Sequence, residues 1–178
     1  AITFRIAQES SQPGFIWMLG LIALVSSLLQ CSYWVYYYVS YTDWVGSYQK
    51  NRTDETVTEK DRKAAESGEM SGAVYFLQRF HNIAYGWQDA LIAALDRFSR
   101  EVADYQDNEE HRKRWVADKT FLTQMGPLCV CSNTMALVVL SLLNQLELFL
   151  VLVVFIGNGY LLVLQGWKII RFKSFVTN

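Results

Sequence analysis

The chain has 178 residues, enough for one compact unit, and its 16 basic and 17 acidic residues nearly balance. A net charge of −1 provides no concentrated basic face, so nucleic-acid binding is not expected. Three cysteines are too few for a disulfide scaffold. The charges are spread unevenly, because 27 of the 33 lie between positions 39 and 126, which sets a polar middle between two apolar ends.

The first apolar segment, residues 15–38, contains no charged residue and follows a short N-terminal tail, residues 1–14. As a helix it would be roughly 36 Å long, which exceeds the hydrocarbon core of a bilayer, about 30 Å. Its last turns are aromatic and are typical of an interfacial belt: Tyr33, Trp34, Tyr36, Tyr37 and Tyr38. A cleaved signal peptide would have a shorter apolar run, so we expect a retained transmembrane helix.

The polar middle, residues 39–126, is expected to be a helical extramembrane insert. Its charge-rich part, Asp54–Glu69, is expected to be a solvated helix or a mobile connection. Apolar residues then recur every three or four positions and predict an amphipathic helix of about thirty residues. We call them the apolar stripe: Phe76, Phe80, Ile83, Trp87, Leu91, Ala94, Phe98, Val102 and Tyr105.

The apolar stripe has two interpretations, which are core packing within the insert and docking onto a partner. A mixture is favoured, in which Trp87, Leu91 and Phe98 are core while Phe76 and Tyr105 reach outward, because so long a helix outruns the helix available to cover it. That second helix is expected over residues 109–125. Its apolar members are Trp115, Phe121, Leu122 and Met125.

The second apolar region, residues 127–167, would be about 61 Å long as one helix, too long for a single simple crossing. Asn144, Gln145 and Glu147 interrupt it. The part after them is the better transmembrane candidate, and the part before them is a second span, a re-entrant helix or an extension of the insert. A basic tail, residues 168–178, favours a cytoplasmic C-terminus. Two crossings, with the insert on the outside and both termini inside, are therefore expected.

Several polar residues inside the apolar segments are candidate sites. Glu147 and Asn158 are intramembrane polar candidates, since an ionisable group in apolar sequence is a functional-site hypothesis; a kink between two helices is the alternative for Glu147. Cys31 is a candidate for pairing with Cys129 or Cys131 if the insert faces an oxidising compartment.

No motif for catalysis, metal binding or phosphate cradling occurs in the sequence. No enzymatic activity and no cofactor are therefore expected.

The layout resembles the membrane proteins of integrating conjugative elements, a family of unknown function linked to type IV secretion operons. The resemblance lies in Ala136–Leu143, in Gly157-Asn158-Gly159 and in Arg171–Phe175, an apolar run that passes through a glycine turn into a basic end. It implies a non-enzymatic component of a conjugation or secretion assembly in a bacterial inner membrane. The expected partners are lipid and other subunits of a membrane complex.

Two alternatives stay open at this point. One is an accessory structural subunit of an energy-transducing membrane complex. The other is a homo-oligomeric channel in which Glu147 lines the pore.

Overall fold

The computed structural model describes residues 2–9, 12–46, 62–63, 67 and 71–177, and in these residues every regular element is a helix. The elements are α1 (Ile2–Glu9), α2 (Pro13–Val45), α4 (Gly72–Val102), α5 (Glu109–Val116), α6 (Lys119–Gln124), the 3-10 turn η1 (Gly126–Leu128), α7 (Val130–Leu142), α8 (Leu146–Val151), the π-helix η2 (Leu152–Gly157) and α9 (Asn158–Val176). The predicted all-helical class is confirmed. Most of the charged segment Asp54–Glu69 lies outside the described residues.

Two of these helices are long and apolar enough to cross a membrane. The first is α2, which begins with Pro13 in its first turn and ends at Gly46, whose φ of +69° suits a residue without a side chain. It continues well past Tyr38, the predicted end of the span. The second runs unbroken from Leu146 to Val176 through α8, η2 and α9, so most of the predicted basic tail is helical.

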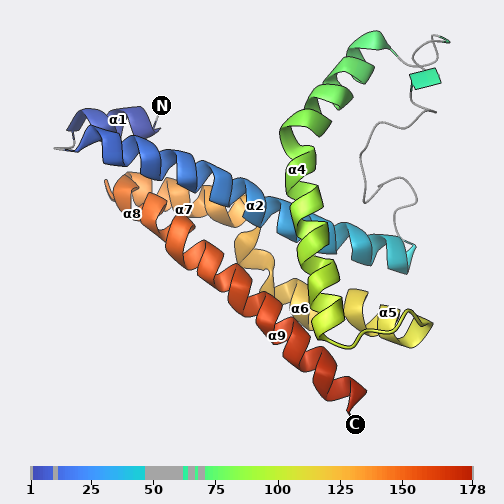
Figure 1. Ribbon diagram of the computed structural model, residues 1–178. Coiled ribbons are helices and arrows are strands. Elements are labelled where there is room, and N and C mark those ends of the chain that lie inside the picture. Colours follow the sequence, from blue (N-terminus) through green and yellow to red (C-terminus); the bar gives the residue numbers. More distant parts are fainter. Residues whose placement is uncertain (1, 10–11, 47–61, 64–66, 68–70, 178) are drawn as a thin grey trace.

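The apolar helices form an arrangement that differs from the predicted topology. In Figure 1, α2 and the α8–α9 helix run in the same direction, and α7 runs back between them. A tight turn at Asn144, with φ of +55°, joins α7 to α8. Side chains of α1, α8 and the first turns of α2 pack into one apolar cluster at this end: Ile6, Ala7, Ile16, Leu19, Ala23, Leu150 and Val153.

The C-terminal turns of α9 pack against the insert at the other end. Arg171 pairs with Asp118 at 3.3 Å, and Lys173 lies 3.8 Å from Asp104. The expectation that the insert and the C-terminus lie on opposite sides of a membrane is therefore wrong, because their side chains touch. The N-terminal helix lies at the far end of α2 (Figure 1).

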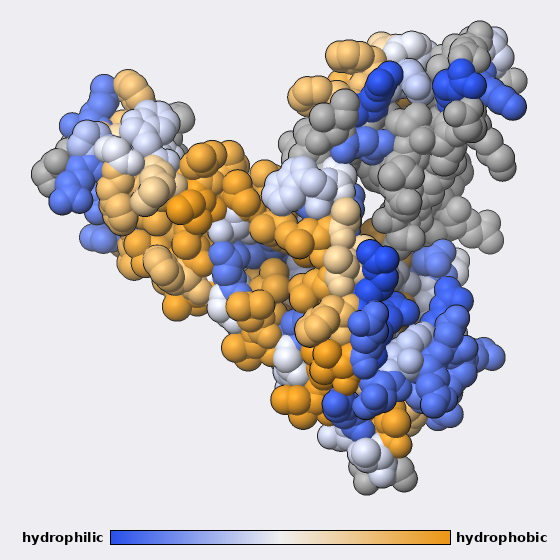
Figure 2. Space-filling view, in the orientation of Figure 1, coloured by the Kyte–Doolittle hydropathy of each residue, from blue (hydrophilic) through white to orange (hydrophobic). Residues whose placement is uncertain are grey.

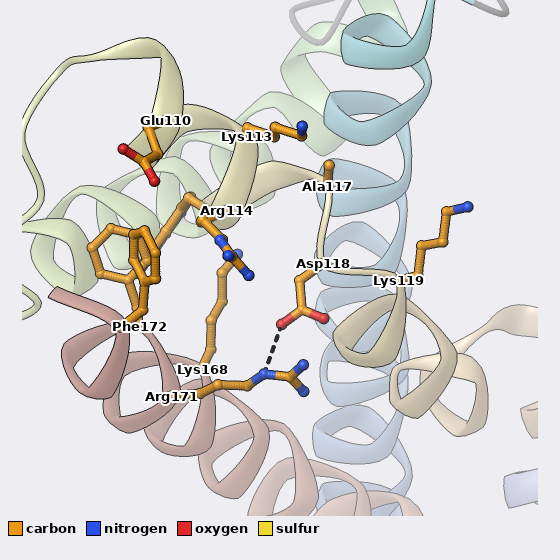
Figure 3. A pocket seen from close by; sticks show the side chains of 11 residues that line it. Glu110, Lys113, Arg114, Ala117, Asp118, Lys119, Lys168, Arg171 and Phe172 are labelled. Atoms are coloured by element: carbon orange, nitrogen blue, oxygen red, sulfur yellow. Dashed lines mark ion pairs between the residues drawn. The ribbon is translucent and has the colours of Figure 1, made fainter. Parts of the chain in front are cut away.

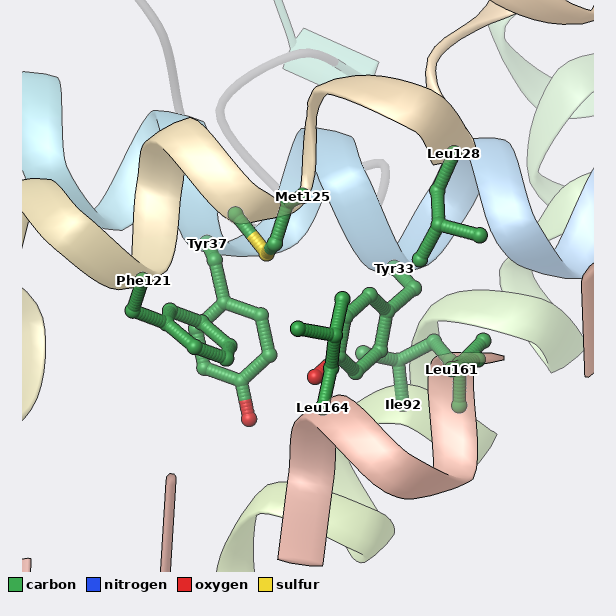
Figure 4. Close-up of a cluster of buried hydrophobic side chains, with 8 residues drawn as sticks. All are labelled: Tyr33, Tyr37, Ile92, Phe121, Met125, Leu128, Leu161 and Leu164. Carbon is green, nitrogen blue, oxygen red and sulfur yellow. The ribbon is translucent and has the colours of Figure 1, made fainter. Parts of the chain in front are cut away.

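The second predicted helix of the insert is divided into α5 and α6. The first piece ends at Val116 with Ala117 as its C-cap, and Asp118 caps the second, since its carboxylate accepts hydrogen bonds from the backbone N–H groups of Thr120 and Phe121. The expected apolar members point inward: Trp115, Phe121 and Met125 are buried. Figure 4 shows the cluster in which α2, α4, α6 and α9 meet: Tyr33, Tyr37, Ile92, Phe121, Met125, Leu128, Leu161 and Leu164.

The long helix of the insert, α4, crosses α2 and turns a different face inward from the one predicted. Trp87, Leu91 and Phe98 were expected in the core, but 47%, 50% and 60% of their surfaces are exposed. Phe76 points outward as predicted, whereas Tyr105 packs against Trp115 and Phe172. Among the α4 side chains that the structure describes, the buried ones lie on a neighbouring face, which is largely polar: Gln88, Ile92, Asp96 and Ser99.

Candidate functional site

Asp96 of α4 is the centre of a buried polar junction between α2, α4, α5 and α9. Its carboxylate accepts hydrogen bonds from Tyr37 Oη at 2.8 Å, Trp115 Nε1 at 2.9 Å and Tyr36 Oη at 3.3 Å. Arg100, one turn further along α4, donates from Nε at 2.7 Å and forms an ion pair. The single carboxylate thus ties three helices together.

The charge of Asp96 is stabilised in this environment although the side chain is buried. Burial by itself raises the pKa of the carboxyl, but the positive charges of Lys168 and Arg100 and the hydrogen bonds from Trp115 and Tyr37 outweigh it and hold the pKa below its usual value. Arg100 responds in the opposite sense: burial lowers its pKa, and Asp96 raises it by more. The junction therefore contains an ionised carboxylate.

A second branch of the junction runs through Gln165 of α9. Its carbonyl oxygen accepts a hydrogen bond from Tyr33 Oη at 2.7 Å, and its amide donates to Ser99 Oγ. The hydroxyl of Ser99 in turn donates a hydrogen bond to the backbone oxygen of Leu95 at 2.7 Å. Each of the three side chains is buried, so α2, α4 and α9 are linked by hydrogen bonds that water does not reach.

Lys168, one turn after Gln165, is buried in an aromatic cage. Its Nζ lies 3.5 Å from the ring centroid of Tyr37, 4.4 Å from that of Phe121 and 4.5 Å from that of Trp115. Only 5% of Lys168 is exposed, and its Nζ has no hydrogen-bond partner among the described residues. Cation–π contacts with three rings stabilise the ammonium but leave its three N–H groups without acceptors.

A cavity of about 530 Å³ opens above Lys168, between α5, α6 and the last turns of α9. Figure 3 shows Arg114 of α5 and Lys168 and Arg171 of α9 extending into it. Five of its lining residues are basic and two are acidic: Lys113, Arg114, Lys119, Lys168 and Arg171, against Glu110 and Asp118. The cavity is therefore positively charged, with a buried ammonium at its floor.

A smaller polar cluster lies inside the apolar helices. The side-chain amide of Gln30 donates to the backbone oxygen of Val153 at 2.9 Å and to Asn158 Oδ1 at 3.1 Å. Asn158 in turn donates to Ser26 Oγ at 2.8 Å. A Cβ on Gly157 would collide with the Gln30 amide, so the glycine gives room for the close approach. The predicted intramembrane candidate Asn158 is thus part of a helix–helix contact.

The other predicted candidates are dispersed. Glu147 is exposed in the first turn of α8, beside the turn from α7, which matches the kink interpretation of this residue. Cys31, Cys129 and Cys131 are free thiols, Cys31 and Cys129 partly buried and Cys131 exposed. Their pairing under oxidising conditions stays a prediction.

The residues that form the junction and the cavity were not predicted as site residues. Asp96 and Gln88 lie outside the predicted apolar stripe, and Lys168 was expected only as part of the basic tail, residues 168–178. One signal was present in the sequence: Gln88, Ile92, Asp96, Ser99 and Ala103 recur every three or four residues, a second face of α4 distinct from the stripe.

Comparisons with protein families, curated proteins and solved structures find no match to this chain. Within the part of the chain that the structure describes, no group of three or more His, Cys, Asp or Glu side chains is placed to hold a metal ion. The chemistry of the junction and the cavity therefore has to be argued from their own residues.

Proposed function

We propose that this chain is a non-enzymatic scaffold subunit embedded in a membrane. In this proposal α2 and the α8–α9 helix cross the bilayer, and α7, about 20 Å long, brings the chain back between them together with the turns at its two ends. The helices α5 and α6 and the ends of α2 and α9 form a head on one side. The chain in this proposal catalyses no reaction. It holds a long helical arm, α4, along the membrane surface, where neighbouring subunits of an assembly can contact the arm.

The observation that carries the proposal is that the apolar side chains of the long helices point outward. Only 28% of the most apolar stretch of α2 is buried, and 17% of that of the α8–α9 helix. A helix of this composition in the core of a water-soluble protein would be covered by its neighbours. Large side chains such as Leu21, Phe155 and Leu162 are instead more than half exposed. A bilayer supplies the cover that the chain lacks.

The three faces of α4 support a position in the plane of the membrane surface. One face packs on α2 through Asp96, and the apolar stripe and the charged residues Arg79 and Arg97 lie on either side of it. In Figure 2 the hydrophobic side of α4 adjoins the apolar surface of α2, and its hydrophilic side adjoins α5. A helix that lies in the interface divides its residues in this way.

The outer half of α4 supports a role as an arm. None of the described side chains between Gly72 and Trp87 is buried, and Phe76, Leu77 and Phe80 are 67%, 63% and 60% exposed. A helix of this length has little stability alone in water, because its nucleation is costly. We assign its cover to lipid along the apolar stripe, which leaves the charged face for partner subunits.

The depth of α4 tests this assignment in the full chain, with Cys31, Cys129 and Cys131 replaced by serine. A nitroxide at a single cysteine introduced in place of Phe80 should be reached by oxygen from the bilayer of a nanodisc. The same label in place of Arg97 should be reached by a water-soluble nickel chelate. Equal access of the nickel chelate to both labels contradicts the surface position. If the label at position 80 is protected from the nickel chelate only in native membranes, and not in nanodiscs, a partner protein rather than lipid covers the apolar stripe.

The crossing number is tested by labelling cysteines introduced at Gln8, Ser71 and Thr177 in sealed vesicles. Three crossings place Ser71 and Thr177 on one side and Gln8 on the other. Labelling of Gln8 and Thr177 from the same side would contradict three crossings.

Membership of a conjugation or type IV secretion assembly stays a prediction, as do the energy-transducing complex and the channel as alternatives. Copurification in mild detergent distinguishes them by the partners recovered.

A further inference from the structure

The cavity between α5, α6 and α9 has a positive charge that its own acidic residues do not balance. Of its two acids, Asp118 is already engaged, since it pairs with Arg171 at 3.3 Å and caps α6. Glu110 lines the cavity in the first turn of α5. Arg114 and Lys168 line the same space and lie against aromatic rings: Arg114 over Phe175, and Lys168 over the ring of Tyr37.

Asp96 does not fill the role of acceptor for Lys168. Its two carboxylate oxygens receive hydrogen bonds from Tyr36, Tyr37, Trp115 and Arg100, and the last of these already carries a full positive charge. The ammonium of Lys168 has no hydrogen-bond partner among the described residues. Carrying a charge on this buried amine without an acceptor is costly, and an anion that enters from the cavity relieves the cost.

We propose that this cavity binds the phosphate group of an anionic ligand, with Lys168 at its floor and Arg114 and Arg171 at its sides. Guanidinium groups match the oxygen spacing of a phosphate with paired hydrogen bonds, and a lysine adds a compact point charge. Arg171 is held for this role by Asp118 and by the ring of Trp167, 5.0 Å from its guanidinium carbon. The mixed set of one buried lysine and two more accessible arginines suits a tetrahedral, multiply charged group.

The phosphate has two sources, a lipid headgroup or a phosphate compound from solution. The cavity lies beside Trp167 and close to the aromatic turns of α2, through Tyr37, which is the depth of headgroups if the helices cross a bilayer. The lipid source rests on the proposed membrane insertion, whereas the recognition of phosphate does not. The two sources are separated by experiment.

The full chain, purified in an uncharged detergent, is titrated with phosphatidic acid and with phosphatidylcholine, and bound lipid is counted by native mass spectrometry. Wild-type protein should retain phosphatidic acid in preference to phosphatidylcholine. Lys168→Met and Arg114→Gln should each weaken this binding about tenfold or more, as the loss of a charge-assisted hydrogen bond does. Arg97→Gln, which removes an exposed charge of α4 outside the cavity, is the matched control and should bind as wild type does.

A parallel titration with inorganic phosphate identifies the source. A rise in the melting temperature with phosphate, lost in Arg114→Gln, indicates a soluble phosphate ligand; binding of phosphatidic acid without this rise indicates a headgroup. Equal weakening by Arg97→Gln, or no binding of either probe, overturns the proposal. If Lys168→Met fails to fold, the exposed Arg114→Gln decides the matter. A chain that is soluble without detergent would refute membrane insertion, and the phosphate titration would still stand.

Discussion

The two halves of α2 make contact with the rest of the molecule in different ways. The first half buries Ile16, Leu19 and Ala23 in apolar contacts with α1, α8 and η2, and only Ser26 near its end accepts a hydrogen bond, from Asn158. The second half buries Tyr33 and Tyr37, whose hydroxyls enter the hydrogen-bond network of α4 and α9. Both halves expose large apolar residues, so the two halves differ in their buried contacts and not in their exposed surfaces.

The difference shows where the specificity of the fold resides. In the proposed bilayer, apolar side chains of neighbouring helices gain little from leaving hydrocarbon for one another, so their packing rests on small residues and close fit. Hydrogen bonds, in contrast, require defined partners at defined positions. The polar junction around Asp96 therefore fixes how α4, α5 and α9 are placed on α2, and the apolar cluster provides contact without the same selectivity.

The largest expected effect comes from removing the centre of the junction. Asp96→Ala removes the ion-pair partner of Arg100 and the hydrogen-bond acceptor of Trp115, and it leaves Tyr37 with only the longer hydrogen bond to Gln165, at 3.3 Å. The free energy of unfolding should fall by about 3–5 kcal/mol, the loss typical of breaking a buried charged pair. Thermal unfolding in detergent measures it. The control, Asp107→Ala in the exposed loop before α5, should change the free energy of unfolding little. An equal loss in both variants would mean that the junction around Asp96 does not stabilise the fold.

A smaller effect is expected from acid. The pKa of Asp96 is lower in the folded chain than in the unfolded chain, so its contribution is complete above the unfolded value, about 3.9. It is lost as the pH falls below that value and through the folded pKa. The melting temperature of the wild type should therefore drop in this acid range more steeply than that of Asp96→Asn. Parallel curves for the two proteins would mean that the carboxylate is not stabilised by folding.

A third effect concerns the polar cluster inside the apolar helices. Gln30→Leu removes the hydrogen bonds to Val153 and Asn158 while keeping a side chain of similar size. A loss of about 1–3 kcal/mol is expected, because the buried acceptors lose their donor. Unfolding in detergent is compared with that of Gln8→Leu on the exposed side of α1. An unchanged stability of Gln30→Leu would show that these groups find other partners.

The smallest effect is expected on the apolar stripe. Trp87→Ala should change the free energy of unfolding by less than about 1 kcal/mol, because half of the side chain is already exposed. Phe121→Ala, in the buried cluster, is the matched aromatic comparison and should cost about 3–5 kcal/mol. If the two losses are equal, Trp87 is packed in the interior and the outward orientation of the stripe is wrong.

The sequence predicts the helices well but not the faces that they bury. Apolar periodicity locates α4 to within a few residues, since a 3.6-residue period is a local property. The assumption that the apolar face of a helix points inward fails here, because Trp87 and Leu91 are exposed and Asp96 is buried. Which face of a helix is covered depends on its neighbours and its solvent, which the periodicity of one segment does not contain.

Two further features lie beyond local pattern for the same reason. The C-terminal helix has its direction because α7 reverses the chain before it. In the sequence α7 is not recognisable as a reversal, because it is only about 20 Å long as a helix and fits an extension of the insert equally well. Lys168 resembles an interfacial anchor in the sequence, and only the rings of Tyr37, Trp115 and Phe121, from three other helices, make it a buried cation.

The π-helix η2 gives the last helix a tolerance to changes in length that its neighbours lack. A π-helical turn contains one residue more than an α-helical turn, and here the widened backbone receives the amide of Gln30 at Val153. Deleting one residue within η2 would return the segment to an α-helix and keep Leu150 and Gln165 on their present faces. Deleting one residue between η2 and Gln165 would turn the rest of α9 by about 100°, which carries Lys168 out of its cage. In evolutionary terms, η2 is a site where this chain can gain or lose a residue.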